Sequence, residues 1–568
     1  MKNALLKSTF ALSFLLVFSF LHATTFYVDS QQSFDSAQRS AAANDTIIWR
    51  NGTFSDIFMD IDKDRLFIAA ETLGGTVFNG ASRVDITGDY ITLEGFQFVG
   101  GDIGTRDVIN TRGSYNTFTQ INIRAYTCYK YLRVREESQY VDITYCNFEN
   151  RINRADQNIL SILVDANQPG YHKIQYCSFK NFEGMGNDEG VEPIRIGLST
   201  QANRNSRTLV EYCYFTQCNG DGELISSKAS QNVYRFNTFE DNPVAELVLR
   251  HGSEGIVYGN FFLKGKGGVR VREGQNHYIY NNYFYEIDDR PIFLQNESSD
   301  PLDNINIAFN TIVDCSEVIL GGDGSFRPTN VTFANNILTD PDDSLFEDRT
   351  GTETWISNIV FGNVGISTPR PGLIVVDPKL ELNSAGFGGL SATSPAIDTA
   401  QSGYAPLPQF MGMDAIDTDV SFDMMGQNRP AVVGEKDLGA NEFPHNTLIQ
   451  PIATEANTGP SYNTSVLTSV ARNTRLVKNL IKINPNPVSS VMNVQLFSEN
   501  NTDLQVDIYN FEGKLIRNIT QQKNFSGEMT LTENLDSLAA GIYTIHAISK
   551  DLKGGFDRIQ TLKFIKSE

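Results

Sequence analysis

The chain has 568 residues, which favours more than one domain, and a formal net charge of −21 from 46 basic and 67 acidic side chains. This acidic balance argues against a protein that binds nucleic acid or anionic membranes, because both attract basic surfaces. Six cysteines in so long a chain exclude a disulfide scaffold, and six scattered histidines argue against a histidine-rich zinc site.

The first 23 residues have the layout of a secretory signal peptide. Lys2 and Lys7 provide the positive start, residues 10–21 form an apolar run too short to span a bilayer, and Ala23 offers a small residue for cleavage. No other stretch is apolar enough for a membrane helix. We therefore expect a secreted or surface-exposed protein without a membrane span.

Next in the chain, a short amphipathic helix is predicted over residues 29–43 and a strand over 44–49, before a turn at Asn51-Gly52. The sequence then repeats. Successive segments carry one apolar anchor each, 22 to 36 residues apart, and most intervals lie in the twenties. The anchors are Phe98, Ile123, Phe148, Phe179, Phe215, Phe239, Phe262, Phe284, Ile312 and Leu338.

The position two residues before the anchor also recurs. It holds Cys146, Cys177 and Cys213, and in later segments Asn237, Asn260, Asn282, Asn310 and Asn336. A repeated asparagine suits stacked parallel coils, because each amide can bond its counterpart about 4.8 Å away. The leucine and asparagine pattern of leucine-rich repeats is absent from this chain, and propeller blades need about 40 residues. The repeat predicts an all-β parallel β-helix, with the early helix capping its open end and the cysteines buried and reduced.

After residue 363 the pattern fades, so residues up to 443 are expected to form the irregular end of a solenoid domain that begins at residue 24. Residues 444–480 are polar and predict a linker. Residues 481–568 predict a small β-sandwich domain, with alternating apolar residues and a turn at Glu512-Gly513.

The C-terminal domain carries three distinctive elements. They are Ile483-Asn-Pro-Asn-Pro487, Leu538 with Gly541 and Tyr543, and Phe564-Ile565-Lys566. Together they resemble the C-terminal sorting domain of the type IX secretion system. The resemblance implies export by that machinery, followed by release or surface anchoring. An ordinary immunoglobulin-like accessory domain is the alternative.

Four successive segments carry charges at alternating positions, which places them on the outer side of one face of the solenoid. The segments are 192–196, 221–224, 246–250 and 269–272, centred on residues 194, 222, 248 and 270. A solvated ladder of salt bridges is one explanation. It accounts poorly for Asp221 and Glu223, which repel each other unless a cation or an arginine lies between them. Oxygen ligands on adjacent rungs suit Ca²⁺, which is therefore an expected cofactor.

Four motifs follow one another in this region: Glu189–Gly197, Glu223–Lys228, Leu249–Gly252 and Gly267–Arg270. Their order and content resemble polysaccharide lyase family 6, which holds alginate lyases and enzymes of the chondroitinase B type. The resemblance covers roughly residues 25–443 and implies a right-handed parallel β-helix. It implies catalysis by Lys228 as base and Arg250 as acid, substrate binding by Arg195, His251, Arg270 and Arg272, and calcium ligation by Glu189, Asp221 and Glu223. The family usually has asparagine at the place of Glu189 and glutamate at that of Asp221.

The resemblance leads to the hypothesis that an anionic, uronic-acid polysaccharide is cleaved by β-elimination. Lys228 must be neutral to take the C5 proton, and nearby positive charge would lower its pKa. Alginate is the preferred substrate, because residues 192–197 look like the alginate lyases, and chondroitin or dermatan sulfate comes second.

Two other functions remain open. A glycoside hydrolase on the same fold would use Asp221 and Glu223 as its paired carboxylates. A non-catalytic glycan-binding surface protein would bind the polymer without shortening it. The lyase is preferred, because Lys228 and Arg250 follow the acid pair in the order of the family. This hypothesis requires Lys228, Arg195, Arg250, Arg270 and Arg272 to lie on one face.

Overall fold

The computed structural model of the protein describes residues 23–152, 158–183, 190–296, 298–383, 385–444, 449–462, 481–484, 488–510, 514–551 and 558–566. Apart from Ala23, the predicted signal peptide lies outside these residues. The chain divides into two compact units, Met1–Val466 and Leu467–Glu568. Within the described residues, no helix combines the length and the apolar character needed to cross a membrane.

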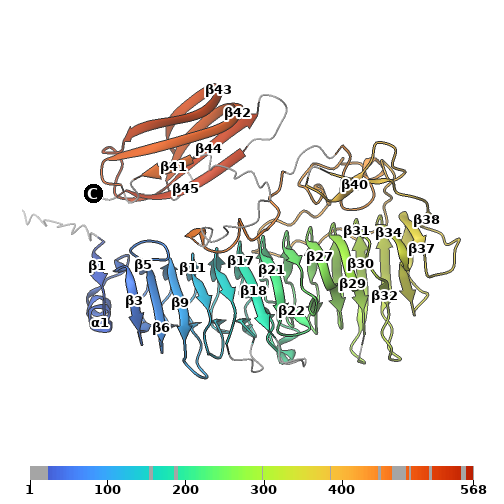
Figure 1. Cartoon of the computed structure of the whole chain (residues 1–568), viewed down its shortest axis with the longest axis horizontal. Helices are drawn as coiled ribbons and strands as arrows, with labels where there is room; N and C mark the ends of the chain where they lie inside the picture. The colour runs from blue at the N-terminus through green and yellow to red at the C-terminus, as the bar shows by residue number, and fades with distance from the viewer. Residues whose placement is uncertain are drawn as a thin grey trace, which may run out of the picture. The chain divides into compact units, whose positions relative to one another are not determined.

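The first unit is a parallel β-helix, as predicted, whose coils stack along one axis and contribute strands to three faces (Figure 1). Face 1 is a 14-stranded parallel sheet. Its strands are β1 (Thr25–Val28), β2 (Thr46–Trp49), β5 (Phe67–Ala70), β8 (Thr92–Glu94), β11 (Thr117–Thr119), β14 (Asp142–Thr144), β17 (Lys173–Gln175), β20 (Leu209–Glu211), β23 (Val233–Arg235), β26 (Ile256–Tyr258), β28 (Gly274–Tyr280), β30 (Leu302–Ala308), β33 (Thr329–Ala334) and β36 (Thr354–Ile356).

A 24-stranded sheet forms the other two faces. Face 2 contains β3 (Gly52–Ser55), β6 (Thr76–Gly80), β9 (Phe96–Gly101), β12 (Asn122–Arg124), β15 (Asn147–Glu149), β18 (Ser178–Glu183), β21 (Tyr214–Asn219), β24 (Thr238–Glu240), β31 (Thr311–Val313), β34 (Ile337–Ser344), β37 (Asn358–Asn363) and β38 (Leu373–Val375). Face 3 contains β4 (Phe58–Ile61), β7 (Arg83–Ile86), β10 (Ile109–Thr111), β13 (Leu132–Val134), β16 (Leu160–Ile162), β19 (Ile194–Ile196), β22 (Glu223–Ser227), β25 (Glu246–Leu249), β32 (Val318–Leu320) and β35 (Phe346–Asp348). The long strands β27 (Phe261–Val271) and β29 (Tyr283–Leu294) each pair on both faces.

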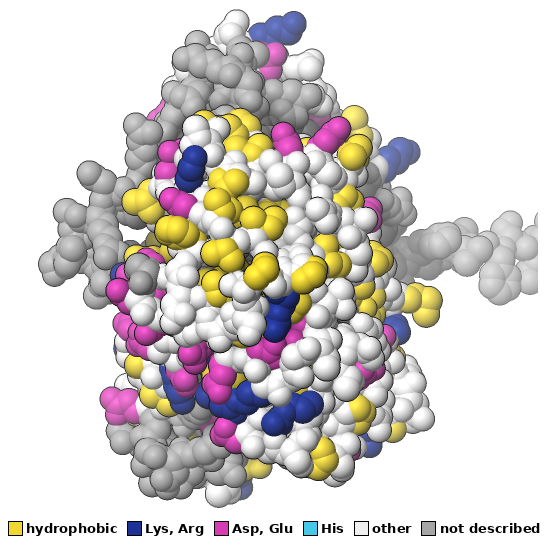
Figure 2. Space-filling view, turned by 90° about the vertical axis from the view of Figure 1, so that its right-hand side faces the viewer, with side chains coloured by type: hydrophobic (Ala, Val, Ile, Leu, Met, Phe, Trp, Pro, Cys, Tyr) yellow, Lys and Arg dark blue, Asp and Glu magenta, His cyan; other side chains and the backbone are white. Residues whose placement is uncertain are grey.

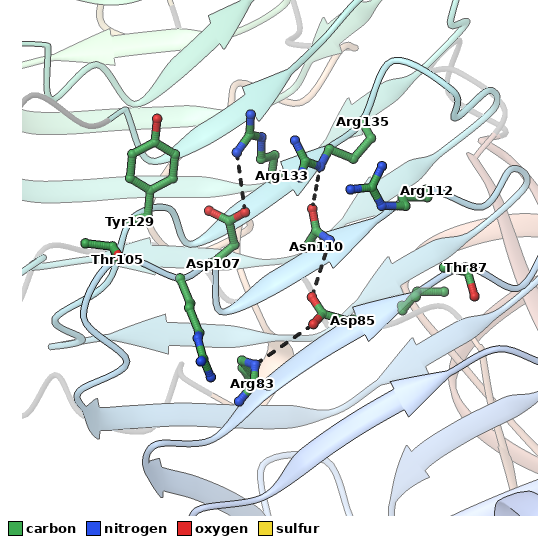
Figure 3. A pocket seen from close by; sticks show the side chains of 12 residues that line it. Arg83, Asp85, Thr87, Thr105, Asp107, Asn110, Arg112, Tyr129, Arg133 and Arg135 are labelled. Atoms are coloured by element: carbon green, nitrogen blue, oxygen red, sulfur yellow. Dashed lines mark hydrogen bonds and ion pairs between the residues drawn. The ribbon is translucent and has the colours of Figure 1, made fainter.

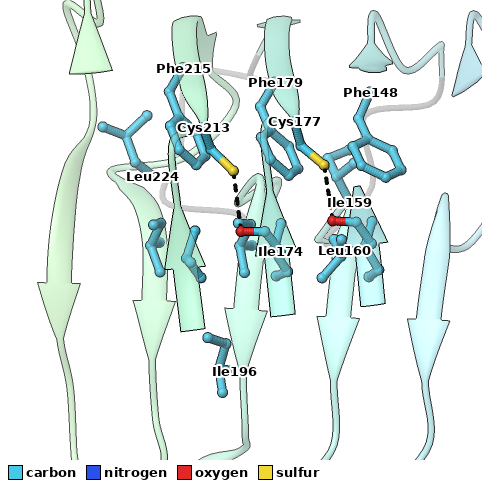
Figure 4. Packing of buried hydrophobic residues seen from close by; sticks show 14 of the residues in the cluster. Phe148, Ile159, Leu160, Ile174, Cys177, Phe179, Ile196, Cys213, Phe215 and Leu224 are labelled. Atoms are coloured by element: carbon cyan, nitrogen blue, oxygen red, sulfur yellow. Dashed lines mark hydrogen bonds between the residues drawn. The ribbon is translucent and has the colours of Figure 1, made fainter. Parts of the chain in front are cut away.

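Side chains of one kind form ladders through the core. The predicted anchors pair in register from coil to coil, and the rings from Phe148 to Phe284 stack with centroids 4.8 to 5.1 Å apart. The cysteines are free and buried, as expected, and Cys213 donates its thiol to the carbonyl of Ile174 at 3.5 Å (Figure 4). Each stacked ring thus meets an identical surface one rung away, which favours the parallel register.

The predicted asparagine ladder is also present. The amide of Asn237 donates to Asn260 at 3.0 Å, and the same side-chain bond repeats through Asn282, Asn310 and Asn336 to Asn358 at 2.9 to 3.0 Å. All these side chains are fully buried. The ladder therefore pairs polar groups that would otherwise be left without partners inside the stack.

The N-terminal end of the stack carries the predicted helical cap, α1 (Gln31–Ser40). Ser30 begins it with a capping box, in which Ser30 and Ser33 each accept a backbone N–H of the other. Phe34 is buried and its ring lies 5.7 Å from that of Trp49. The helix thus covers apolar side chains of the first coils.

The C-terminal end of the stack is different, because β37 and β38 leave apolar side chains exposed, among them Phe361, Ile374 and Val375. Figure 2 shows this end of the molecule, where hydrophobic side chains lie beside a band of basic and acidic ones. Two short strands follow, β39 (Leu380–Leu382) and β40 (Gly388–Leu390), which pair antiparallel. Two short 3₁₀ segments, Ser199–Gln201 and Val433–Glu435, complete the unit.

The irregular segment after the last coil returns along the stack. The hydroxyl of Tyr258 donates to Asp417 at 3.0 Å, Lys180 pairs with Glu455 at 2.8 Å, and the hydroxyl of Tyr462 donates to the carbonyl of Phe96 at 3.2 Å. Residues 449–462 lie within the range predicted as a linker, yet they contact the coils through side chains such as Tyr462. Residues 463–480 lie outside the described residues.

The second unit is a five-stranded, mainly antiparallel β domain. Its strands are β41 (Ile481–Asn484), β42 (Val491–Asn510), β43 (Leu515–Asn534), β44 (Gly541–Asp551) and β45 (Arg558–Lys566). The core contains Tyr543 and Phe564, two residues of the predicted motifs, and Leu538 of the same motifs packs against it. The all-β character of this domain agrees with the sequence.

Candidate active site

Three cations stand in one column on face 3, each directly after a strand. The backbone N–H of Lys228 donates to Ile196 at 2.8 Å, that of Arg250 to Ser227 at 2.7 Å, and that of Arg272 to Leu249 at 3.0 Å. Successive members of the column are therefore one rung apart, about 4.8 Å. Arg195, at the centre of β19, and Arg270, near the end of β27, stand in the neighbouring column. The five basic residues thus share one face, as the hypothesis required.

Glu223 is the counter-charge at the centre of this cluster. Its Oε1 lies 2.8 Å from Nη1 of Arg250 and 3.8 Å from a guanidinium nitrogen of both Arg270 and Arg272. The Glu223 side chain is only 3% exposed. Burial opposes ionisation, but the Ser226 hydroxyl and the charges of Arg250 and Arg270 lower the pKa of Glu223. Glu223 is therefore an anion that holds several cations together.

Two further buried carboxylates orient the remaining arginines. Oε1 of Glu246 lies 3.0 Å from Nε of Arg270 and 3.1 Å from Nη2 of Arg290. Glu192 holds Arg195 with two oxygens, at 2.9 Å from Nε and 2.7 Å from Nη2. A bidentate pair of this kind fixes the plane of the guanidinium.

Sequence reasoning assigned no role to Glu192 or Glu246 and missed Arg290. Their alignment with charged or small residues on the preceding coil is the signal that could have revealed these residues. Glu246 pairs in register with Glu223 on the previous coil, and Arg290 pairs with Gly267 on the coil before it.

Lys228 differs from its neighbours because, among the described residues, its amine has no hydrogen-bond or ion-pair partner. It is half-buried. Burial lowers the pKa of Lys228, and the positive charge of Arg195 lowers it further, against the opposing effect of Glu192 and Glu223. This environment favours a neutral amine with an available lone pair, which is the form that accepts a proton.

His251 follows Arg250 in a turn, with a backbone φ of +71°. Its Nδ1 contacts Oε2 of Glu273, whose side chain is buried. This contact fixes the imidazole beside the column of cations.

Two of the three predicted calcium ligands, Asp221 and Glu223, bind groups of the protein itself. Asp221 accepts the backbone N–H of Gly190 and, at 2.9 Å, that of Glu223, while Glu223 is surrounded by arginines. Glu189 lies outside the described residues. The described residues contain no cluster of three or more His, Cys, Asp or Glu arranged for a metal.

The register of β22 differs from the prediction. The expected alignment placed residue 194 beside 222, but Ile194 pairs with Ile225. Against β25, β22 also contains a one-residue bulge at Leu224, because Glu223 pairs with Glu246 while Ile225 pairs with Leu247. The extra residue turns the Glu223 carboxylate toward the arginines. The predicted alignment of residue 248 with 270 is confirmed.

Two protein families match the chain. Residues 28–319 match Chondroitinase B, and residues 482–554 match the secretion system C-terminal sorting domain. The second match indicates secretion or an outer-surface location. No curated protein matches the chain.

Several solved structures share the fold of the first unit. The PL6 family alginate lyase AlyGC superposes with a TM-score of 0.59 at 23% identity, over 65% of this chain and 56% of its own. The chain thus spans little more than half the length of that enzyme. A mannuronic acid specific family 6 lyase from human gut microbiota gives a TM-score of 0.57 at 22% identity, over 62% and 91%. A family 6 polysaccharide lyase from Pseudopedobacter saltans gives 0.51 at 19%, over 62% and 96%.

Proposed function

Because the chain belongs to the Chondroitinase B family, we propose that it is a secreted polysaccharide lyase that cleaves a uronic-acid polymer, alginate, by β-elimination. One observation carries the proposal. Lys228 presents a half-buried amine of lowered pKa, without a partner among the described residues, next to a column of oriented arginines. The alginate lyases among the similar structures support the choice of polymer.

The proposed reaction uses the residues as follows. Neutral Lys228 takes the C5 proton of a uronate, the bond between C4 and the leaving O4 breaks, and a double bond forms between C4 and C5. The C5 proton is acidic enough only if the charge of the adjacent carboxylate is neutralised. Arg250 and Arg272 are placed to do this, since both lie within one or two rungs of Lys228. The leaving oxygen then receives a proton.

Arginine is a poor proton donor, because its pKa lies above about 12. We therefore assign Arg250 to charge stabilisation, and the proton on O4 to the Lys228 ammonium or to water. Arg195, His251 and Arg270 orient the substrate. Calcium was expected as the neutralising cation, but the donors around Asp221 and Glu223 favour arginines in that role, so the proposal has no metal-dependent step.

A hydrolase is disfavoured by the charge state of Glu223. A glycosidase needs one carboxylic acid of raised pKa to protonate its leaving group. The pKa of Glu223 is lowered, and its oxygen is held by Arg250 at 2.8 Å. Chondroitin or dermatan sulfate stays the second candidate substrate, which the match to Chondroitinase B favours.

A panel of polymers tests the proposal. The purified protein is incubated with alginate blocks, chondroitin and dermatan sulfates and polygalacturonate, and the ultraviolet absorbance of an unsaturated product is followed. Alginate should give the fastest rise. Chain shortening without a double bond would indicate hydrolysis, and binding without shortening would indicate a non-catalytic glycan-binding protein.

A further inference from the structure

A second cluster of cations lines a cavity of about 580 Å³ on face 3, over strands β7, β10 and β13 (Figure 3). Five of its lining residues are arginines: Arg83, Arg106, Arg112, Arg133 and Arg135. The proposed lyase mechanism uses none of them. The volume is within the range of about 300–1,000 Å³ typical of ligand sites.

The acidic residues around the cavity do not balance these five arginines, although Arg112 lies 2.7 Å from Glu137 outside the lining. Asp107 lies 3.8 Å from Arg133, and Asp85 lies 3.9 Å from Arg83, so neither pair is at hydrogen-bond distance. Arg135 donates to the neutral amide of Asn110 at 2.9 Å. The cavity therefore keeps a surplus of positive charge, in contrast to the rest of this acidic chain.

Burial and crowding of the guanidinium groups affect both their pKa values and their hydrogen bonding. Burial lowers the pKa of Arg135, and the charges of Arg133 and Arg112 lower it further. The buried Nε of Arg133 has no hydrogen-bond partner among the described residues. A balanced ladder of surface ion pairs would show neither property, so this arrangement is better explained by an anionic ligand.

The cavity is aligned with the active site. Arg133 pairs with Ser161, which pairs with Arg195, and Arg195 pairs with Ser226 of the strand that precedes Lys228. Three rungs therefore separate β13 from β22, about 14 Å along the axis. A polymer lying along face 3 with one uronate at Lys228 would reach the cavity with a sugar a few units away.

We propose that this cavity is a second, non-catalytic site that binds acidic sugar units of the same polymer and anchors long chains while Lys228 acts on them. The inference rests on the proposed function. Arginine suits the task, because its planar guanidinium binds a carboxylate or a sulfate through two parallel hydrogen bonds.

The first experiment measures binding without turnover. Full-length protein with Lys228→Ala is titrated with alginate, and in a parallel arm with chondroitin sulfate, with and without the added pair Arg133→Ala/Arg135→Ala. The pair should weaken polymer binding by about tenfold and reduce its salt dependence. Alginate carries only carboxylates, whereas chondroitin sulfate carries carboxylates and sulfate esters, so a larger effect of the pair on chondroitin sulfate would show that the cavity also binds a sulfate ester.

The second experiment measures chain-length dependence in the active enzyme. The ratio of KM for the polymer to KM for a trisaccharide should rise about tenfold in the Arg133/Arg135 pair. Arg106→Ala removes a cation from the same cavity. Because Arg106 is exposed, this substitution does not disturb the core, so it tests the cavity even if the double variant misfolds. It should raise the ratio of the two KM values less than the double substitution does. Arg124→Ala is the matched control, since this exposed arginine lies in the same coil but on face 2.

The outcomes are distinguishable. Unchanged polymer affinity in the pair, or an unchanged KM ratio, would overturn the anchoring site while leaving the lyase proposal intact. Absence of unsaturated product from the wild type would overturn the lyase proposal, whereas the binding titration would still test the cavity.

Discussion

Nη1 of Arg250 lies 2.8 Å from Oε1 of Glu223, although the two residues belong to successive coils and are 27 positions apart. The same oxygen is 3.8 Å from both Arg270 and Arg272. One buried carboxylate thus compensates several cations that would otherwise repel one another. This relationship makes Glu223 a positioning residue for the cations that face the substrate.

Replacing Glu223 by glutamine keeps its size and removes its charge. We expect kcat/KM to fall about 10- to 100-fold, because the arginines lose the anion that holds their geometry. Glu246→Gln is the matched comparison and should have a smaller effect, since Glu246 orients Arg270 and Arg290 but not Arg250. Full activity in Glu223→Gln would contradict this role.

Lys228→Ala should lower the rate of unsaturated product formation by about 10²- to 10⁴-fold, the range typical of a lost general base. Lys228→Arg should not restore activity, because arginine stays protonated. Lys173→Ala, on face 1, serves as the control and should behave as the wild type. Turnover by Lys228→Ala near the wild-type rate would refute the assignment of the base.

The pH dependence follows from the neighbours of Lys228. The neutral amine is the active form, so kcat/KM should rise with pH through the lowered pKa of Lys228. Arg195→Gln removes a charge that lowers this pKa, and the rising limb should move to higher pH. Glu192→Gln removes a charge that raises it, and the limb should move to lower pH. Shifts in the same direction in both variants would contradict the assignment.

Chelation tests the arrangement of Asp221 and Glu223. After exhaustive dialysis against EDTA we expect kcat/KM to change by less than roughly twofold, because protein donors occupy positions that calcium ligands would need. A loss of activity that Ca²⁺ restores would reverse this expectation. It would also point to Glu189, the third residue of the predicted ligand set.

The asparagine ladder makes a prediction about stability. Asn282→Ala would leave the backbone N–H of Asn260 and the carbonyl of Val257 without their partners, both within the buried stack. We expect the free energy of unfolding to fall by at least about 1–3 kcal/mol in denaturant titrations. Asn167→Ala, in an exposed turn, is the control. Equal stability of the two variants would show that the ladder contributes little.

The repeating features of the β-helix were the easiest to predict from the sequence. The phenylalanine anchors and the Asn237 to Asn336 column could be recognised because each coil presents the same residue to its neighbour at one register. Alternating charges also placed Arg195, Arg250 and Arg270 on a common face. These features depend on local periodicity, which a single sequence displays directly.

The features that the sequence did not predict depend on irregular backbone or on contacts between residues far apart in the sequence. The pairing of β22 with β19 lies three residues from the expected alignment, and a one-residue bulge at Leu224 interrupts its pairing with β25. The partners of Glu246 and the arginine-lined cavity arise from residues scattered over several coils. The segment that carries Tyr462 is polar and without periodicity, so its contacts with the coils could not be inferred.

That returning segment changes how the solenoid should unfold. In a simple repeat array each coil touches only its neighbours, so the ends can fray independently. Here Tyr462 bonds to Phe96 across 366 positions of sequence, while Asp417 and Glu455 bind coils further along. Unfolding of the C-terminal coils would therefore also release the returning segment from the coils that it contacts. The fold should therefore melt as one cooperative unit and form slowly, because its closure joins the two ends of a long chain.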